Sequence, residues 1–488
     1  MIVPSLSEFR SLAKSGRLVP IHLEFFADHH TPVSAFREID DGSYSFLLES
    51  VEGGEEWGRY SLLGSRPSLV FVARGDRCEI RRDDRWTSGS RHPIEELGGL
   101  LRQHQAVALP GVPRFCGGAV GYFRYDAARW FERLPARAAD DLPLPDAVFM
   151  FGDVVSVFDH LTHTLKVVTH ARGEGGADDA YAAATRRLEA EVERLQRPMV
   201  WAEPAPGEAP PAPVSTVSRD GFIEAIEQAK EHIRAGDVYR VVLSHRMSAP
   251  VMRPALEIYR ALRVTHPSPY LHFLRLGDIS LAGSSPELLV RSTGAVVEVR
   301  PLAGTRPRGR GAEEDRRLEE ELRAGERERA EQVMLVDLAR SDVGRVSEFG
   351  TVETGECMRV ERRSQALHLV SSVRGRVRPD LEPLDVVRAC FPAGTASGTP
   401  RIRAMELIEE LEPVRRGVYA GAVGHFDYHG GLDLCNAVRT LVHANGRAYW
   451  SVGAGILAGS EPEHEWEETM NKGRALWLTV QRAERGAR

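Results

Sequence analysis

Residues 421–456 read GAVGHFDYHGGLDLCNAVRTLVHANGRAYWSVGAGI, and this stretch decides the fold class. Short apolar runs alternate in it with turns that are rich in glycine. The dipeptide Asn445-Gly446 lies between two such runs and is typical of a two-residue β-hairpin. The stretch therefore predicts successive antiparallel strands joined by hairpins.

Helical segments flank this stretch. Residues 219–236, RDGFIEAIEQAKEHIRAG, carry apolar side chains at helical spacing and end in glycine, and residues 239–246, YRVVLSHR, then predict a strand. Residues 401–413, RIRAMELIEELEP, predict a further helix that stops at its proline. The class is therefore α+β with much antiparallel sheet, not a regular βαβ alternation.

Composition divides the chain into three expected parts. Residues 1–200 contain short apolar or alternating runs between turns and predict a strand-rich region. Residues 201–214 are rich in proline and alanine and predict a linker to the mixed region 215–488. The hexapeptides GAVGYF (118–123) and GAVGHF (421–426) resemble each other, either by chance or as similar hairpins on one sheet.

The whole chain has an ordinary globular balance, with 488 residues, 42% hydrophobic and 27% charged. A formal charge of −7 and the lack of basic runs interleaved with aromatics argue against a nucleic-acid partner. Five scattered cysteines without a C-x-x-C motif indicate neither a zinc site nor a disulfide framework. No signal peptide or long apolar run is evident, so we expect a soluble cytoplasmic protein without a membrane partner.

Two Glu-x-x-Glu pairs stand at the heads of predicted helices. Glu328 and Glu331 form one pair, and Glu465 and Glu468 form the other. Glutamates three residues apart share a helix face, and carboxylates from two helices are suitable oxygen ligands for Mg²⁺. The alternative is that each pair belongs to an ordinary solvated helix face.

Small-residue loops and cations suggest an anionic substrate. The segment VGAGILAGS (452–460) reads as a loop whose backbone N–H groups an anion can approach, although glycines in a tight hairpin explain it as well. In FPAGTASGTPRIRAMEL (391–407) a second small-residue loop leads directly into a helix, whose free N–H groups also favour a carboxylate. Arg439, in an apparent strand, is suited to a carboxylate. Lys472 is either a further cation of the site or an ordinary helix partner of Glu468.

Two further residues have alternative readings. His368 lies in the apolar run ALHLVSSV and is either a core histidine or a functional one. Glu287, in AGSSPELLV, is either a strand-edge residue or, if buried beside a metal, a general acid with a raised pKa.

Read in order, these segments resemble the chorismate-utilising enzymes, and most closely the anthranilate synthase component I family. The phrases that carry the resemblance are AGSSPELL (282–289), PLAGTRPRGR (301–310), ERAEQVMLVDLARSDVGRV (328–346), HLVSSVRG (368–375), FPAGTASGTPRIRAMELI (391–408), GVYAGAVGHF (417–426), NAVRT (436–440), VGAGI (452–456) and EWEETMNKGRAL (465–476). The resemblance implies a layered α/β sandwich built on two packed antiparallel sheets.

The resemblance also implies a site. Mg²⁺ would be held by Glu331 and Glu468, with Glu328 and Glu465 adjacent, and would bind the ring carboxylate of chorismate. Substrate contacts would come from Gly304, Thr305, Thr395, Tyr419, Arg439, Gly453, Ala454, Gly455 and Lys472. Glu287 would protonate the departing ring hydroxyl and ammonia would add to give aminodeoxyisochorismate. His368 would then assist loss of pyruvate and aromatisation to anthranilate.

Regulation and partners follow from the same resemblance. The segments LLES and PSPYL match a tryptophan feedback site, which implies inhibitor contacts from Ser50, Pro269, Tyr270 and Leu271. We find no catalytic cysteine motif of a glutamine amidotransferase, so ammonia is expected from solution or from a separate amidotransferase subunit. The expected assembly is a hetero-oligomer, namely a heterotetramer.

Two positions bear on the branch of the family. Ala303 stands where aminodeoxychorismate synthases often carry a nucleophilic lysine, and it cannot form that adduct. Arg240 stands where isochorismate and salicylate synthases carry a lysine base and anthranilate synthases usually carry glutamine. Arginine stays protonated and cannot serve as that base, whereas neutral ammonia needs no deprotonation before it attacks.

The sequence therefore predicts an Mg²⁺-dependent lyase that makes anthranilate from chorismate for tryptophan biosynthesis. One alternative is an aminodeoxyisochorismate, isochorismate or salicylate type of synthase with the same fold. Another is a non-catalytic regulatory subunit that binds tryptophan.

Overall fold

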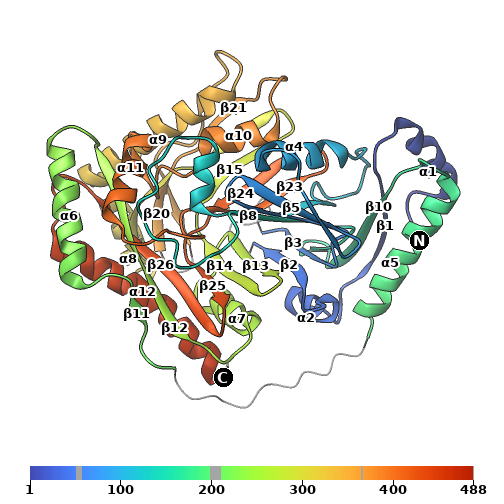
Figure 1. Cartoon of the computed structure of the whole chain (residues 1–488), viewed down its shortest axis with the longest axis horizontal. Helices are drawn as coiled ribbons and strands as arrows, with labels where there is room; N and C mark the ends of the chain where they lie inside the picture. Colours follow the sequence, from blue (N-terminus) through green and yellow to red (C-terminus); the bar gives the residue numbers. More distant parts are fainter. Residues whose placement is uncertain (51–57, 198–209, 364–365, 487–488) are drawn as a thin grey trace.

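A computed structural model describes residues 1–50, 58–197, 210–363 and 366–486. Within these residues, two large antiparallel sheets of twelve and eleven strands are accompanied by a sheet of three (Figure 1). This arrangement confirms the α+β class and the two packed sheets expected from the sequence. The described residues contain no helix long and apolar enough to cross a bilayer.

The first sheet contains strands from both ends of the chain. In spatial order they are β1 (Val19–Phe26), β10 (Thr164–Ala171), β9 (Val154–Asp159), β3 (Tyr60–Ser65), β2 (Tyr44–Glu49), β13 (Tyr270–Leu276), β14 (Ile279–Ser285), β25 (Thr440–Ala444), β26 (Arg447–Ile456), β12 (Arg240–Pro250) and β11 (Val214–Ser215), with β22 (Gly398–Thr399) paired to β12.

The second and third sheets complete the strands. The second runs β18 (Glu353–Thr354), β21 (Val373–Arg376), β16 (Val296–Val299), β15 (Leu288–Thr293), β24 (Leu432–Asn436), β23 (Ala422–Asp427), β7 (Gly118–Phe123), β8 (Ala147–Phe151), β4 (Leu69–Arg74), β5 (Arg77–Arg82) and β6 (Arg85–Ser88). The third runs β17 (Leu302–Pro307), β20 (Ala366–Val370) and β19 (Arg359–Arg362).

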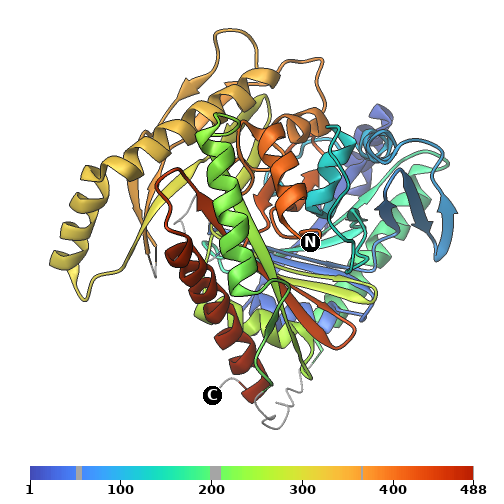
Figure 2. The same cartoon turned by 60° about the vertical axis from the view of Figure 1, so that its left-hand side comes forward.

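Helices cover the outer faces of the sheets. They are α1 (Leu6–Leu12), α2 (Pro32–Ile39), α4 (Pro93–Gln103), α5 (Ala177–Leu195), α6 (Arg219–Arg234), α7 (Ala255–Thr265), α8 (Ala312–Ala324), α9 (Glu326–Val346), α10 (Pro383–Cys390), α11 (Arg401–Leu411) and α12 (Pro462–Arg485), with short 3₁₀ turns η1 (Ala13–Ser15) and η2 (Tyr125–Trp130). In Figure 2 the gold helices α8 and α9 follow one another along one edge, and α12 lies beside α6. The predicted helices at 219–236 and 401–413 are confirmed as α6 and α11.

Three apolar layers of the core pack against the large sheets, and a smaller cluster packs against the third sheet. One layer fills the space between the large sheets, with Phe46 and Leu274 from the first sheet packed near Tyr122 and Val423 from the second. The other two layers lie under the helices on the outer faces. Alternating strand residues thus bury one face between the sheets and the other beneath helices.

The two similar hexapeptides are neighbouring strands, since β7 pairs with β23 and Gly121 lies opposite Gly424. A Cβ at Gly121 would lie 1.8 Å from the carbonyl oxygen of Val148, so the strands require glycine there to approach closely. Asn445 and Gly446 have φ of 50° and 68°, which confirms the predicted hairpin. The division at 201–214 stays a prediction, and residues 201–209 of the expected linker lie outside the described part.

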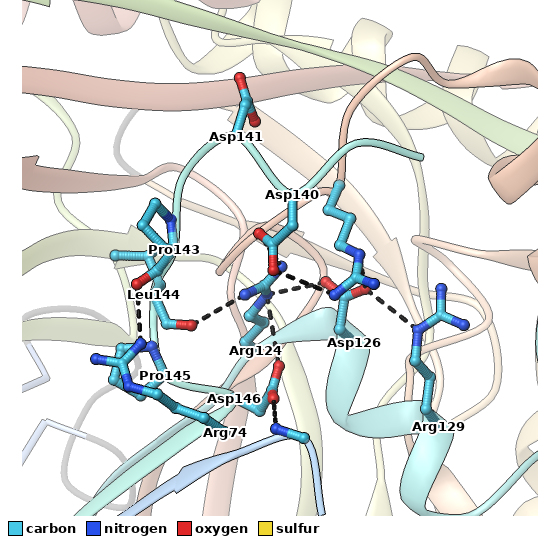
Figure 3. Close-up of polar contacts among 12 residues, drawn as sticks. Arg74, Arg124, Asp126, Arg129, Asp140, Asp141, Pro143, Leu144, Pro145 and Asp146 are labelled. Atoms are coloured by element: carbon cyan, nitrogen blue, oxygen red, sulfur yellow. Dashed lines mark hydrogen bonds and ion pairs between the residues drawn. The ribbon is translucent and has the colours of Figure 1, made fainter. Parts of the chain in front are cut away.

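A buried network of charged side chains connects distant segments of the chain (Figure 3). Arg124, which follows β7, lies 2.9 Å from Asp126 and 2.8 Å from Asp140 and is 1% exposed. Arg415, which follows α11, lies 3.7 Å from Asp126 and 3.2 Å from Asp140. The segment that leads from α11 to β23 is therefore fixed against the first half of the chain.

Candidate functional site

A cavity of about 550 Å³ lies between the small sheet, the end of β26 and α12. The predicted site residues that line it are Thr305, His368, Tyr419, Arg439, Gly453 and Lys472. They come from β17, β20, β26, α12 and two connections, so the fold brings together residues that are far apart in the sequence. Their roles stay predictions.

His368 and Thr305 face each other across two paired strands. β17 and β20 are in register at these residues, and Thr305 Oγ1 lies 3.1 Å from His368 Nδ1. His368 is 4% exposed, and burial together with the positive charges of Arg363 and Arg439 lowers its pKa to about 4. The imidazole is therefore neutral near pH 7 and can accept a proton.

Gly304 marks an irregularity in β17 beside this pair. The register of β17 shifts between Ala303 and Thr305, and Gly304 has φ of 59°. A Cβ at Gly304 would lie 2.8 Å from a methyl group of Leu322 and 3.2 Å from Glu328 Cγ. Glycine at this position thus lets Glu328 approach the small sheet.

Arg439 does not lie in a strand, and that expectation is wrong. It stands between β24 and β25, with φ of 50°, where the chain crosses from the second sheet to the first. The turn breaks the apolar run LCNAVRTL into two strands and leaves the guanidinium exposed in the cavity wall. An arginine in this position is able to bind a carboxylate without the penalty of a buried charge.

Lys472 combines both of its expected contacts. Its Nζ lies 2.6 Å from Glu468 Oε1 and donates a hydrogen bond to the carbonyl oxygen of Gly453 at 2.9 Å. The Lys472 and Glu468 side chains are 49% and 43% exposed, so water screens their attraction. The pair places Glu468 beside the glycine end of β26.

The segment VGAGI (452–456) is part of strand β26 and not a loop, so the expectation of a loop that begins at residue 452 is wrong. Gly453, Ala454 and Gly455 pair with Ser244, Leu243 and Val242 of β12. A Cβ at Gly453 would lie 2.6 Å from the Tyr419 hydroxyl, and one at Gly455 would lie 2.5 Å from the Arg240 guanidinium. These glycines make room for side chains above the strand.

Glu287 lies behind the cavity, next to Pro286 in its wall. Its Oε2 accepts a hydrogen bond from the Asn436 side-chain amide at 2.8 Å. Burial raises the pKa of Glu287, while Thr395 and Asn436 partly oppose the rise. Tyr419 is partly buried in the cavity wall, and its pKa, which burial raises to about 12, is also affected by the charge of Glu287. Glu287 therefore stays protonated up to a higher pH than an exposed glutamate does.

The four glutamates of the expected metal site have different surroundings. Glu331 Oε1 lies 3.4 Å from Arg240 Nε, and Glu328 Oε1 lies 2.6 Å from Arg306 Nη2. Glu465 is buried at 4% exposure. Over the described ranges, no group of three or more His, Cys, Asp or Glu side chains is arranged to hold a metal ion.

The donor chemistry nevertheless fits Mg²⁺. This ion is commonly held by one or two carboxylates, with water and substrate oxygens completing its shell. Glu331 reaches Gly455 of β26 through Arg240, and Glu468 reaches Gly453 through Lys472. Through these two cations, both carboxylates are linked to the same short stretch of β26.

A second cavity of about 340 Å³ lies between the two large sheets. All the residues expected for tryptophan line it, namely Ser50, Pro269, Tyr270 and Leu271. The Tyr270 hydroxyl donates to Asp433 Oδ1 at 2.9 Å and accepts from Arg291 at 3.1 Å. Pairing of β2 with β13 brings Glu49, the neighbour of Ser50, opposite Leu271.

Known proteins show which family this architecture represents. Residues 45–477 match the family described as chorismate binding enzyme. Anthranilate synthase component 1 of Acetivibrio thermocellus is 42% identical over 99% of this chain and 99% of its own length. The same component of Thermus thermophilus is 44% identical over 96% of this chain and 99% of its own. The chain belongs to the anthranilate synthase component 1 family.

Solved structures agree with this assignment. Anthranilate synthase component I from Streptococcus pneumoniae TIGR4 superposes with a TM-score of 0.78 at 34% identity, covering 86% of this chain and 92% of that one. The isochorismate synthase MenF from Escherichia coli gives a TM-score of 0.73 at 18% identity over 97% of this chain and 99% of its own, which shows a shared fold.

Two residues of the cavity wall were not predicted from the sequence of this family member. Arg363 lines the cavity and donates to the carbonyl oxygen of Pro286 at 2.6 Å. His266 also lines it, and burial together with Arg439 lowers its pKa to about 4. No motif marks Arg363, whereas His266 stands directly before the Pro-Ser-Pro turn that was assigned only to tryptophan.

Proposed function

We propose that this family member is the large subunit of anthranilate synthase, a carbon–oxygen lyase that converts chorismate and ammonia to anthranilate and pyruvate in tryptophan biosynthesis. The observation that carries the proposal is the cavity that gathers Thr305, His368, Tyr419, Arg439, Gly453 and Lys472. It offers cations for a dianionic substrate and a neutral imidazole for proton transfer. The names of the relatives support the same product, and the description of the family supports chorismate as the substrate.

Acid and base roles follow from the two environments. A ring hydroxyl is a poor leaving group unless it is protonated, and the raised pKa of Glu287 keeps a proton available for it. Ammonia then adds to the ring to form aminodeoxyisochorismate. His368, neutral because its pKa is lowered to about 4, accepts a proton as pyruvate leaves and the ring becomes aromatic.

Arg439 and Lys472 bind and orient the substrate in this scheme. Arg439 presents a planar fork of donors that matches a carboxylate. Lys472 lines the same cavity and contributes a point charge near the carbonyl of Gly453. Thr305 holds His368 in orientation through their contact at 3.1 Å.

Glu331 and Glu468 would hold the Mg²⁺ ion, with Glu328 and Glu465 adjacent. When bound, the ion would neutralise the ring carboxylate and withdraw electrons from the ring. Ammonia is the nucleophile that suits this site best, because Arg240 cannot deprotonate water. We propose that a separate glutamine amidotransferase subunit supplies the ammonia within a hetero-oligomer.

Feedback control by tryptophan is the regulatory part of the proposal. The cavity between the sheets has the size for a small ligand, and it places Glu49 and Asp433 near apolar walls formed by Pro269 and Leu271. Such a combination suits an amino acid with a large apolar side chain.

The test measures anthranilate fluorescence with purified chain, chorismate, MgCl₂ and ammonium at mildly alkaline pH. We expect turnover that requires Mg²⁺, that falls when tryptophan is added, and that glutamine does not support in the absence of a partner subunit. Chromatography identifies the product. A product that keeps its enolpyruvyl group, a hydroxylated product, or no turnover would contradict the proposed reaction.

A further inference from the structure

Arg240 lies against a carboxylate assigned to the metal. Its Nε lies 3.4 Å from Glu331 Oε1, which joins the first residue of β12 to the first turns of α9. The Nε–H group has no hydrogen-bond acceptor within the described ranges, so charge rather than an aligned hydrogen bond holds the two groups together.

The guanidinium is fixed on its other sides. Its Nη1 donates to the carbonyl oxygen of Thr395 at 3.1 Å and lies 3.4 Å from that of Gly394. Gly455 lies beneath it and has no side chain to displace it. The Arg240 side chain is only 10% exposed, so it cannot swing into water.

The second carboxylate has a different partner. Lys472 holds Glu468, but both side chains are nearly half exposed, and the flexible lysine stem can turn away. Arg240 can neither leave its packed position nor lose its charge. A metal ion can therefore replace Lys472 at Glu468 easily. At Glu331 it must compete with Arg240, whose position and charge are fixed.

We infer that Arg240 competes with the divalent cation for Glu331 and thereby weakens metal binding to the free chain. The inference rests on the proposed function, because it takes Glu331 as a metal ligand. A metal ion that binds Glu331 breaks the contact with Arg240 and then lies near a fixed positive charge. Both effects oppose metal binding until an anionic substrate adds negative charge.

The test is direct titration of the full chain with MgCl₂ by calorimetry in the absence of chorismate, repeated with Mn²⁺ by electron paramagnetic resonance. Arg240→Gln is expected to tighten metal binding roughly tenfold, which is similar in size and opposite in direction to the loss of affinity when a supporting neighbour of a metal ligand is removed. Arg240→Lys keeps the charge and is expected to stay close to the parent chain.

Arg246→Gln is the matched control. Arg246 is a second buried arginine of β12, and it pairs with Asp141 away from Glu331. We expect it to leave the metal affinity unchanged. In a Glu331→Gln background, Arg240→Gln is expected to lose its effect, because the shared carboxylate is gone.

The outcomes separate the inference from the proposed function. Unchanged or weaker metal affinity in Arg240→Gln, with normal weakening by Glu331→Gln, overturns the inference and leaves the metal site standing. Equal tightening in Arg240→Lys shows that packing and not charge is responsible, which also overturns it. If Glu331→Gln does not alter metal binding, the proposed metal site fails and the inference fails with it.

Discussion

The buried ion pair Glu412–Arg416 supports Tyr419 and β12, and its removal should be costly. Arg416 Nη2 and Nε lie 2.5 Å and 2.9 Å from the two oxygens of Glu412, and the side chains are 1% and 5% exposed. Glu412 Oε1 also accepts from the backbone N–H of Ser244 at 2.7 Å. Arg416 lies 5.7 Å from the centre of the Tyr419 ring.

The perturbation is Arg416→Met, which leaves Glu412 buried without its counter-charge. Removal of one partner of a buried pair costs about 3–5 kcal/mol. With an unfolding entropy of about 2.1 cal/mol/K per residue, a loss of about 4 kcal/mol lowers the melting temperature of this chain by about 4 °C. Activity should fall as well, because the same pair fixes the segment that carries Tyr419.

The assay is differential scanning calorimetry together with anthranilate formation. The double variant Arg416→Met with Glu412→Leu leaves no buried charge without a partner. The Ser244 N–H and hydroxyl lose Glu412, and the carbonyl oxygens of Ala396 and Val242 lose Arg416, as they do in the single variant. Each buried polar group left unpaired costs about 1–3 kcal/mol. The double variant should therefore be more stable than Arg416→Met alone. A single variant that loses less than about 1 kcal/mol, or a double variant whose loss is the sum of both single losses, would refute this reasoning.

Three further predictions concern the site itself. Glu468→Gln should remove most Mg²⁺-dependent turnover in a metal titration. It should change the free energy of unfolding by less than about 1 kcal/mol, because the pair of Glu468 with Lys472 is nearly half exposed. Glu463→Gln on the same helix is the control, and equal turnover in the two variants would contradict the assignment of Glu468 to the metal. His368 should titrate near pH 4 by NMR; because its folded pKa lies below its unfolded value of about 6.5, its contribution to stability is present above that pH and is lost as pH falls toward 4, and His368→Gln should flatten this part of the stability profile. Tyr270→Phe should weaken tryptophan inhibition several-fold at unchanged kcat, because it removes the hydroxyl that contacts Asp433; an unchanged inhibition constant would argue against this cavity.

The sequence predicted elements whose signal is local. The hairpin at Asn445-Gly446 and the helix α6 follow from turn chemistry and periodicity within a few residues. The expectation of a loop at VGAGI failed because glycine occurs both in turns and in strands that other side chains approach closely. These two uses look the same in sequence. Glycines at 453 and 455 leave space for Tyr419 and Arg240, and these neighbours come from elsewhere in the chain.

The site was predicted as a set of residues but not as an arrangement. Helical spacing placed Glu331 and Glu468 on α9 and α12, whereas their partners Arg240 and Lys472 depend on how these helices meet β12 and β26. Arg439 was misplaced because an apolar run on both sides reads as one strand. The crossing between sheets that breaks the run is a property of the tertiary fold.

One short segment borders both cavities, which gives the proposed tryptophan control a physical basis. Residues His266, Pro267 and Ser268 line the proposed substrate cavity, and the next three residues line the cavity between the large sheets. Ser268 Oγ donates to the carbonyl oxygen of Ser285, and Ser284 Oγ donates to that of His266, so the segment is fastened to the end of β14 just before Glu287. A ligand that moves this segment would move His266 and the proposed acid together, which is the kind of shared element that can couple two sites.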